Sequence, residues 1–460
     1  MADDHRVEKD SMGEVSIPAG AYWGAQTQRA VENFSVSEHR IPEAMIRALA
    51  LIKKHAAISN GELGTIEPHI ADAVRDAANE VLRGGWDEHF PIDVFQTGSG
   101  TSWNMNANEL IANRANEILG KPIGLRRPIH PNDHVNRCQS SNDVIPTAIH
   151  IANRLRMPAL VEAVRELSQS FRRKADELAH AVKIGRTHLQ DAVPMTVGQE
   201  FDGFAVQMKK SAERLERTTG NLEELALGGT AVGTGLNAHP EFAAKTIAGI
   251  ARETGIPFRP AESRFEAIAS RDAQVELAGG LNSLAVALMK IANDLRLLAS
   301  GPRAALGEII LPELQPGSSI MPGKVNPVIP EMIIQIAAHV MGKVTSITTA
   351  GQHAPLELNM MNPLVAYETL SAIDILREGC LAFARRCVDG IAVDEARCEY
   401  WIEWSLALVT PLATRIGYDK AAELAHKAFE EKRTIREIVS ESGLLSDEEI
   451  KALLDPRSMI

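Results

Sequence analysis

Aromatic residues are scarce in this sequence: they fill 4% of its 460 positions, although hydrophobic residues fill 45%. A core of that size must therefore be built mainly from Ala, Leu, Ile, Val and Met. These residues suit packed helices, whereas sandwiches and barrels concentrate aromatic and β-branched side chains. The composition predicts a large, mainly α protein, long enough for two or three domains.

Cysteine is also rare, with only Cys138, Cys380, Cys387 and Cys398 in the whole chain. None of them forms a Cys-x-x-Cys pair, and none joins histidines at a spacing typical of zinc sites. We therefore expect reduced thiols in a cytoplasmic protein and no metal site.

Long apolar runs and basic runs are missing as well. Residues 1–12 are polar and acidic, without the apolar core of a signal peptide. No run of about 18 apolar residues is present, so we expect no membrane span. The net charge of −12, with no Lys/Arg-rich tract, argues against nucleic acid and anionic membranes as partners. An acidic protein that binds an anion must gather positive charge or N–H groups at its site.

Helical periodicity is what the sequence has in quantity. Residues 160–182, 277–298 and 333–347 each repeat apolar side chains in steps of three and four, which marks one face of a helix. The second stretch alternates the two steps throughout, the heptad pattern of near-antiparallel bundles. Helices with apolar stripes this long can bury more than one side only if other helices surround them. We therefore expect the chain to self-associate.

Shifts in composition divide the chain into three predicted domains. These are a mixed helical domain of residues 1–139, a long-helix bundle of residues 140–396 and a small helical domain of residues 397–460. In the last domain, Thr434 with Glu437 and Ser446 with Glu449 have the spacing of capping boxes and predict the starts of two short helices.

Several segments are too polar and too rich in glycine for their helical surroundings. Residues 97–106 place Ser and Thr among glycines before a helix, which fits an anion site and an ordinary helix cap equally well. Residues 130–136 could bind an anion near Arg126 and Arg127, whereas residues 140–143 by themselves fit a helix cap better.

Two later segments point more clearly to function. His188 follows Thr187 in a predicted polar turn, which favours a functional histidine over a structural one. Residues 317–327 form a predicted loop between two helices, with two glycines, two prolines, two serines, one lysine and one asparagine. Glu331 follows at the start of the next helix. A plain connection does not need this mixture, so we interpret the segment as a lid or active-site loop.

The loop at residues 317–327 resembles the signature of the fumarase/aspartase superfamily. Further segments fit the family pattern in the same order over essentially the whole chain: residues 23–29, 97–101, 130–136, 139–143, 185–191, 228–237, 290–302 and 416–418. The resemblance implies a mainly α, three-domain fold whose central long-helix bundle forms a twenty-helix core in a homotetramer. It also implies active sites built from several subunits, and catalysis without a metal or other cofactor.

Members of this superfamily share one reaction type. A base removes the proton beside a carboxylate, the carbanion spreads into that carboxylate as an aci-acid, and a group on the neighbouring carbon leaves to give fumarate. His188 and residues 130–133 resemble class II fumarases, whereas aspartases carry Gln at the first position. The implied reaction is the reversible hydration of fumarate to L-malate. The alternatives are an aspartate ammonia-lyase and a catalytically silent relative that keeps the fold.

The resemblance also assigns roles to residues. Ser318 would take the C3 proton of malate, with its alkoxide stabilised by loop N–H groups and Lys324. His188, paired with Glu331, would handle the water that leaves or attacks. The residues expected to bind the substrate are Ser99, Gly100, Thr101, Ser140, Ser141, Asn142, Thr187, Ser319, Lys324 and Asn326. A second, non-catalytic dicarboxylate site is expected at Arg126, His130, Asn132 and Asp133.

The chain departs from the family pattern in two places. Ser102 and Trp103 stand where the pattern has Gln-Ser or Ser-Ser, so Trp103 could pack in the core or reshape the substrate pocket. Residues 351–359 lack the Asn-Gly pair expected before Glu-Leu-Asn. Both differences bear on substrate affinity.

Overall fold

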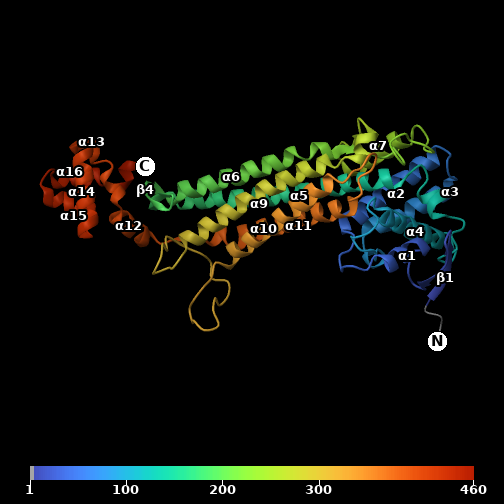
Figure 1. Cartoon of the computed structure of the whole chain (residues 1–460), viewed down its shortest axis with the longest axis horizontal. Helices are drawn as coiled ribbons and strands as arrows, with labels where there is room; N and C mark the ends of the chain where they lie inside the picture. The colour runs from blue at the N-terminus through green and yellow to red at the C-terminus, as the bar shows by residue number, and fades with distance from the viewer. Residues whose placement is uncertain (1–4) are drawn as a thin grey trace. The chain divides into compact units, whose positions relative to one another are not determined.

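The computed structural model describes residues 5–460 and is mainly α-helical (Figure 1). The chain folds into two compact units. The first unit comprises Met1–Val161, Arg214–Ser283 and His339–Leu376, and the second comprises Glu162–Glu213, Leu284–Ala338 and Arg377–Ile460. Residues 1–4, part of the stretch expected to lack a signal peptide, lie outside the described residues.

The first unit is built around α2 (Glu43–Glu62), which buries side chains around most of its circumference. A helix that is apolar on nearly all sides must be surrounded. Its neighbours include α3 (Pro68–Arg83), α4 (Thr101–Ile118) and α7 (Phe242–Thr254), and their Ala, Ile, Leu and Val side chains form one continuous core. The remaining elements of this unit outside the long helices are β1 (His5–Asp10), β2 (Gly13–Pro18), α1 (Ala25–Asn33), η1 (Asp87–His89), η2 (Pro131–Val135), η3 (Gly220–Glu223), β5 (Glu224–Leu225), β6 (Arg259–Pro260) and α8 (Arg264–Ala269).

The second unit contains a bundle of long helices that run side by side (Figure 1). They are parts of α5 (Ser141–Glu177), α6 (Val197–Arg217), α9 (Asp272–Leu298), α10 (Val328–Gly351) and α11 (Asn362–Arg386). The Phe171 ring packs edge-on against Phe201, Phe204 and Phe383, with ring centroids 5.6–6.0 Å apart. These four phenylalanines thus pack where helices of the bundle meet.

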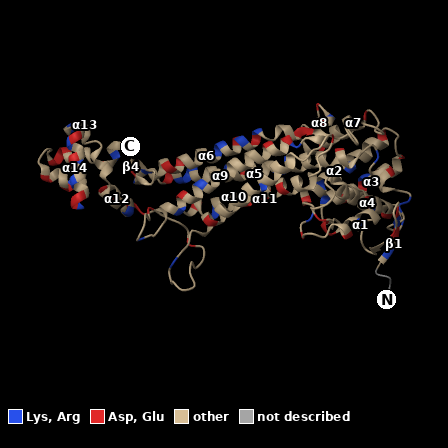
Figure 2. Ribbon diagram, in the orientation of Figure 1, with Lys and Arg blue, Asp and Glu red and all other residues tan. Residues whose placement is uncertain are grey.

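The heptad seam expected at residues 277–298 is confirmed. The residues of the seam all lie in α9 and are at most 5% exposed: Leu277, Leu281, Leu284, Leu288, Ile291, Leu295 and Leu298. By length and composition α9 is apolar enough to cross a membrane, but half of its most apolar stretch is buried inside the protein. It is therefore a core helix. Lys and Arg are interspersed with Asp and Glu along the bundle helices (Figure 2).

The helix expected over residues 160–182 is wrong at its C-terminal end. Helix α5 ends at Glu177, and Val182 begins β3 (Val182–Thr187). The start of α6 supplies the reason, because the N–H groups of Val197 and Gly198 donate to carbonyls of residues 181 and 178 at 2.9 and 3.1 Å. Those carbonyls are satisfied without a further helical turn. The apolar pattern continues because Val182 packs on the C-terminal core.

The C-terminal segment forms a small core of its own between residues 402 and 454, joined by Ile184. Both predicted capping boxes are confirmed, at α15 (Ile435–Ser442) and α16 (Asp447–Leu453). The other elements of the second unit are β4 (Gln190–Thr196), β7 (Ile309–Ile310), η4 (Val388–Gly390), β8 (Ala392–Val393), α12 (Glu395–Trp404), η5 (Leu406–Val409), α13 (Ala413–Ile416), α14 (Tyr418–Glu431) and η6 (Pro456–Met459). The three-domain division stays a prediction.

All four cysteines are buried and unpaired. Burial raises the pKa of the Cys380, Cys387 and Cys398 thiols to about 12. A thiol that stays protonated is a poor nucleophile. Three of the four cysteines are therefore packing residues.

Replacing Thr434 with Ala removes the hydroxyl that accepts the Glu437 N–H at 3.2 Å. We expect a loss of about 1 kcal/mol in the local stability of the C-terminal helices. Amide hydrogen exchange of residues 435–442 measures this loss. Thr434→Ser keeps the acceptor and should retain protection, and equal loss in both variants would contradict the capping role.

Candidate active site

The first unit brings together three of the hydroxyl groups expected to bind substrate. The Ser99 and Thr101 hydroxyls lie 2.8 Å apart, and Thr101 Oγ1 donates to Ser141 Oγ at 2.9 Å. Thus the loop before α4 meets the first residue of α5. Gly100 makes this possible: it has φ of 75°, and a Cβ there would lie 2.9 Å from the Ile145 side chain. The left-handed conformation and the close approach both require glycine.

Ser140 and Asn142 complete this group of polar residues. Ser140 Oγ accepts the Asn142 N–H at 3.2 Å, and the Asn142 amide donates to the carbonyl of Ala231 at 2.8 Å. The helix-cap interpretation of residues 140–143 is therefore confirmed. It does not exclude a role in binding, because Ser140, Ser141 and Asn142 are all half-buried rather than enclosed.

The residues directly after the segment that departs from the family pattern lie against the same loop. The Asn362 N–H donates to the carbonyl of Gly98 at 3.0 Å. A Cβ on Gly98 would lie 1.8 Å from the carbonyl oxygen of Met360, so the two backbones touch. Asn359 is buried and donates to the carbonyl of Ala350 at 3.0 Å. Changes in residues 351–359 can therefore act on the 97–101 loop through the backbone.

Trp103 is fully buried within the core of the first unit. Its backbone N–H donates to Gln96 Oε1 at 3.3 Å, and its indole N–H is without a partner among residues 5–460. A side chain with no exposed surface cannot line a substrate pocket of this unit. Of the two interpretations of Trp103, packing is the one that the structure supports.

In the second unit, Thr187 and His188 lie at a hairpin and not in the plain turn that we expected before a helix. Strands β3 and β4 pair antiparallel, with Thr187 opposite Gln190. His188 and Leu189 form the two-residue loop with φ of 57° and 60°, the conformation of a type I′ turn. The hairpin places both site residues, Thr187 and His188, on exposed surface.

A buried carboxylate holds the base of this hairpin. Glu308 is fully buried and accepts hydrogen bonds from both terminal nitrogens of Arg186, at 2.8 and 2.9 Å. Lys183 Nζ lies 3.3 Å from the same carboxylate and 2.8 Å from Glu200. Removing one partner from a buried charge cluster is strongly destabilising. No sequence pattern pointed to Glu308, which lies in the chain between α9 and α10 without a motif around it.

The loop at residues 317–327 is closed at its base by its own polar groups. The Gly317 N–H donates to the carbonyl of Lys324 at 2.9 Å, and the Asn326 amide donates to the carbonyl of Gly317 at 2.6 Å. A Cβ on Gly317 would lie 2.2 Å from the Lys324 oxygen, so only glycine fits. Asn326 is therefore engaged in shaping the loop. Ser319 and Lys324 are exposed.

Ser318 is held by two N–H groups of the same loop. Its Oγ accepts from the backbone of Ile320 at 3.2 Å and of Met321 at 3.0 Å. Both donors point at the atom that would carry negative charge in an alkoxide. Donors already aimed at a developing charge stabilise it without reorganisation. This is the arrangement that the expected base requires.

His188 and Glu331 both belong to the second unit. Within its described residues, no hydrogen bond or ion pair joins them. Glu331 lies half-buried in the first turn of α10. The expected pairing is not formed inside one chain and stays a prediction.

The residues expected to form a second anion site gather around η2. His130 Nδ1 accepts the N–H groups of Asn132 and Asp133 at 3.2 and 3.3 Å, so this nitrogen carries no proton. Burial, reinforced by the Arg126 charge, lowers the pKa of His130. Its approach to the Asp133 carboxylate at 3.3 Å is therefore not an ion pair. Arg126 donates to the carbonyl of Lys9 at 2.9 Å.

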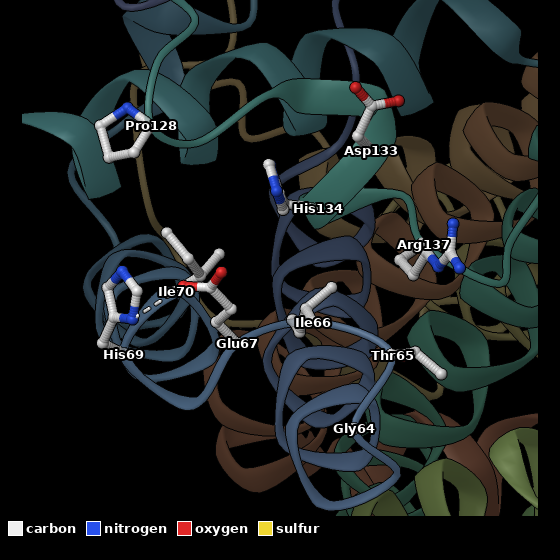
Figure 3. Close-up of a pocket in the computed structure, with 10 residues that line it drawn as sticks. All are labelled: Gly64, Thr65, Ile66, Glu67, His69, Ile70, Pro128, Asp133, His134 and Arg137. Atoms are coloured by element: carbon white, nitrogen blue, oxygen red, sulfur yellow. Dashed lines mark ion pairs between the residues drawn. The ribbon is translucent and has the colours of Figure 1, made fainter.

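A pocket adjoins this segment, lined by parts of residues 64–70 on one side and by parts of residues 128–137 on the other (Figure 3). Asp133 and Glu67 both contribute carboxylates to it, and His69 pairs with Glu67 at 3.4 Å. Two carboxylates repel a dicarboxylate, whereas Arg137 attracts it. The second anion site stays a prediction.

Comparison with known proteins now bears on the family. A family model described as "Lyase" matches residues 13–342, and one described as "Fumarase C C-terminus" matches residues 408–460. The class II fumarate hydratase of Neisseria meningitidis is 49% identical over 456 residues, covering 99% of both chains. That of Halobacterium salinarum is 51% identical over 463 residues, covering 100% of this chain and 98% of its own. The chain belongs to the class II fumarase family.

Solved structures agree with this family. The class II fumarase of Schistosoma mansoni superposes with a TM-score of 0.95 at 38% identity, covering 99% of each chain. A fumarate lyase:delta crystallin of Brucella melitensis, solved with cobalt bound, gives 0.96 at 45% identity, covering 99% of this chain and 100% of its own. For this class II fumarase, the expected mainly α, fumarase-like fold is thus confirmed, and the fumarase interpretation is confirmed over the aspartate ammonia-lyase.

Trp103→Phe tests the packing role of this side chain in the fumarase. We expect a loss of about 1–3 kcal/mol in unfolding free energy, because the smaller ring leaves a cavity. The KM for L-malate should stay within about twofold of wild type, because the residues expected to bind the substrate are unchanged. Trp404→Phe, at a 46% exposed position, is the matched control for stability. A large change in KM with unchanged stability would favour the reshaped pocket instead.

Proposed function

We propose that this chain divides the hydration of fumarate to L-malate between two groups of residues, one in each compact unit. The first group, around Thr101 and Ser141, binds the substrate carboxylates. The second group, with Ser318 and His188, transfers the protons. The activity itself follows from the family: the chain is a fumarate hydratase, a hydro-lyase. The observation that carries the assignment is the pair of N–H groups aimed at Ser318 Oγ.

In this assignment Ser318 removes the C3 proton of malate as an alkoxide. The two loop N–H groups and Lys324 stabilise the negative oxygen once the loop excludes water. His188, oriented by Glu331, donates a proton to the departing hydroxyl group and returns the water in the reverse direction. Ser99, Gly100, Thr101, Ser140, Ser141, Asn142, Thr187, Ser319, Lys324 and Asn326 hold the carboxylates and favour the aci-carboxylate over the ground state.

The assembly that fits this assignment is a homotetramer with shared sites and a twenty-helix core. Three observations support it. The predicted site residues fall in both units, and His188 and Glu331 do not pair within one chain. In addition, α9 exposes Val286 and Leu297 at 51% and 41%, although its other face is fully buried. We also propose that the enzyme is cytoplasmic. A second dicarboxylate site is proposed at Arg126, His130, Asn132 and Asp133.

Absorbance of fumarate after addition of L-malate, with EDTA present, tests the assignment of the base. Wild type should produce fumarate without added metal. Ser318→Ala should lower kcat by about 10²–10⁴-fold, because general base catalysis contributes that much. Ser458→Ala, at an exposed serine of η6, is the matched control. A Ser318→Ala variant with wild-type kcat would exclude Ser318 as the base.

Mixing two inactive variants tests the shared sites. Ser318→Ala removes a residue of the second unit, and Ser141→Ala removes one of the first. If a site takes these residues from different subunits, refolding the two variants together should restore part of the activity, because some sites then receive both intact residues. Each variant refolded alone should stay inactive. A mixture as inactive as its components would place each site within one chain.

A further inference from the structure

We infer that Lys53 is a positioning residue for this reaction, whose buried ammonium group fixes the turn that presents Ser140, Ser141 and Asn142 to the substrate. Asp143 fixes the same turn from its other end. This inference rests on the proposed substrate-binding role of these three residues. Neither anchor belongs to the site assigned above.

Lys53 lies on α2 and is fully buried. Its Nζ donates to Asn104 Oδ1 at 2.8 Å, Gln139 Oε1 at 2.9 Å and Asn136 Oδ1 at 3.0 Å. The three acceptors come from α4, from the end of η2 and from the residue directly before Ser140. One side chain thus joins three separate segments at a single point.

The acceptors are also joined to one another. The Asn104 amide donates to Asn136 Oδ1 at 3.2 Å, and the Asn136 amide donates to the carbonyl of Gln139 at 3.2 Å. The Gln139 amide donates to the carbonyl of Val135 at 3.0 Å. These bonds define which amide atoms are oxygens, so the three atoms facing Lys53 are all acceptors.

Three acceptors require three hydrogens, which only the ammonium form of a lysine provides. Burial lowers the pKa of Lys53 to about 7, while the charge of Asp143 opposes that shift. Burying a charge costs free energy that an apolar side chain of similar size would not cost. A lysine here is therefore poorly explained by packing alone, and two of its three hydrogen bonds lead to the segment before Ser140.

Asp143 holds the other end of the turn. Its Oδ1 accepts the Ser140 N–H at 2.9 Å, and its Oδ2 accepts the N–H groups of Gly228 and Thr230, each at 2.9 Å. Burial raises its pKa to about 6, against the three N–H donors and the charge of Lys53, which favour the carboxylate. Ser140, Ser141 and Asn142 therefore lie between two fixed charged groups, with half-buried side chains.

The test compares Lys53→Met with Lys54→Met. Methionine keeps the apolar stem and the volume of Lys53 but removes the ammonium group. We expect kcat/KM for L-malate to fall on the order of 10–100-fold, mainly through a raised KM, because binding groups displaced by a fraction of an ångström lose their contacts. Lys54 lies on the same helix as Lys53, and its Nζ donates to Glu253 of α7 at 2.8 Å. Replacing Lys54 should leave KM and kcat/KM unchanged.

Gln139→Met is the second variant, in case Lys53→Met does not fold. It removes one acceptor of Lys53, and it should raise KM while the assembly and the circular dichroism stay those of wild type. Folded variants with wild-type KM and lowered thermal stability would overturn the inference, because Lys53 would then only stabilise the fold. An inactive wild-type protein would instead overturn the proposed function.

Discussion

The carboxylate of Asp143 determines much of the geometry of the first unit. It lies fully buried at the start of α5 and receives backbone N–H groups from its own turn and from the residue 228–230 turn. Backbone donors cannot rotate away as side chains do, so both turns are fixed once this carboxylate is in place. Gly228 has φ of 89°, and a Cβ there would lie 2.5 Å from that of Ala243, so this turn depends on glycine too.

The second unit uses the same physical principle. A buried carboxylate, Glu308, takes both nitrogens of Arg186 and so fixes the hairpin that carries His188. The 317–327 loop then arranges its own N–H groups around Ser318. In both units, buried charged groups and backbone donors determine where the side chains assigned to the proposed site lie. Such prearranged polar surroundings are what stabilise a developing negative charge without further cost.

Much of the fold followed from periodicity and capping. The heptad seam of α9 and the capping boxes of α15 and α16 were predicted because each depends on a local pattern in the sequence. The end of α5 was not, because the bonds that end it come from the start of α6, outside the pattern. The hairpin at His188 was missed for a related reason: His188 and Leu189 adopt left-handed conformations without the Asn-Gly pair that usually marks such turns.

The candidate site was predicted only in part. Motif resemblance found Ser318 and the Ser140–Asn142 turn. It did not find Lys53 or Glu308, because a single charged residue near apolar neighbours gives no sign of being buried. A helical lysine can extend its amine to solvent, and only the structure shows that Lys53 has three amide oxygens around it instead. The sequence left two interpretations of Trp103, because its position next to predicted site residues does not show which way its side chain points.

Amide hydrogen exchange of the wild-type enzyme without substrate tests the central claim most directly. The claim is that Asp143 and Lys53 fix the substrate-binding turn before any ligand arrives. It predicts that the N–H groups of Ser140, Gly228 and Thr230 exchange as slowly as those inside α2, with no further slowing when fumarate or L-malate is added. Rapid exchange in the free enzyme that becomes slow only with ligand would contradict it, because the turn would then be ordered by the substrate.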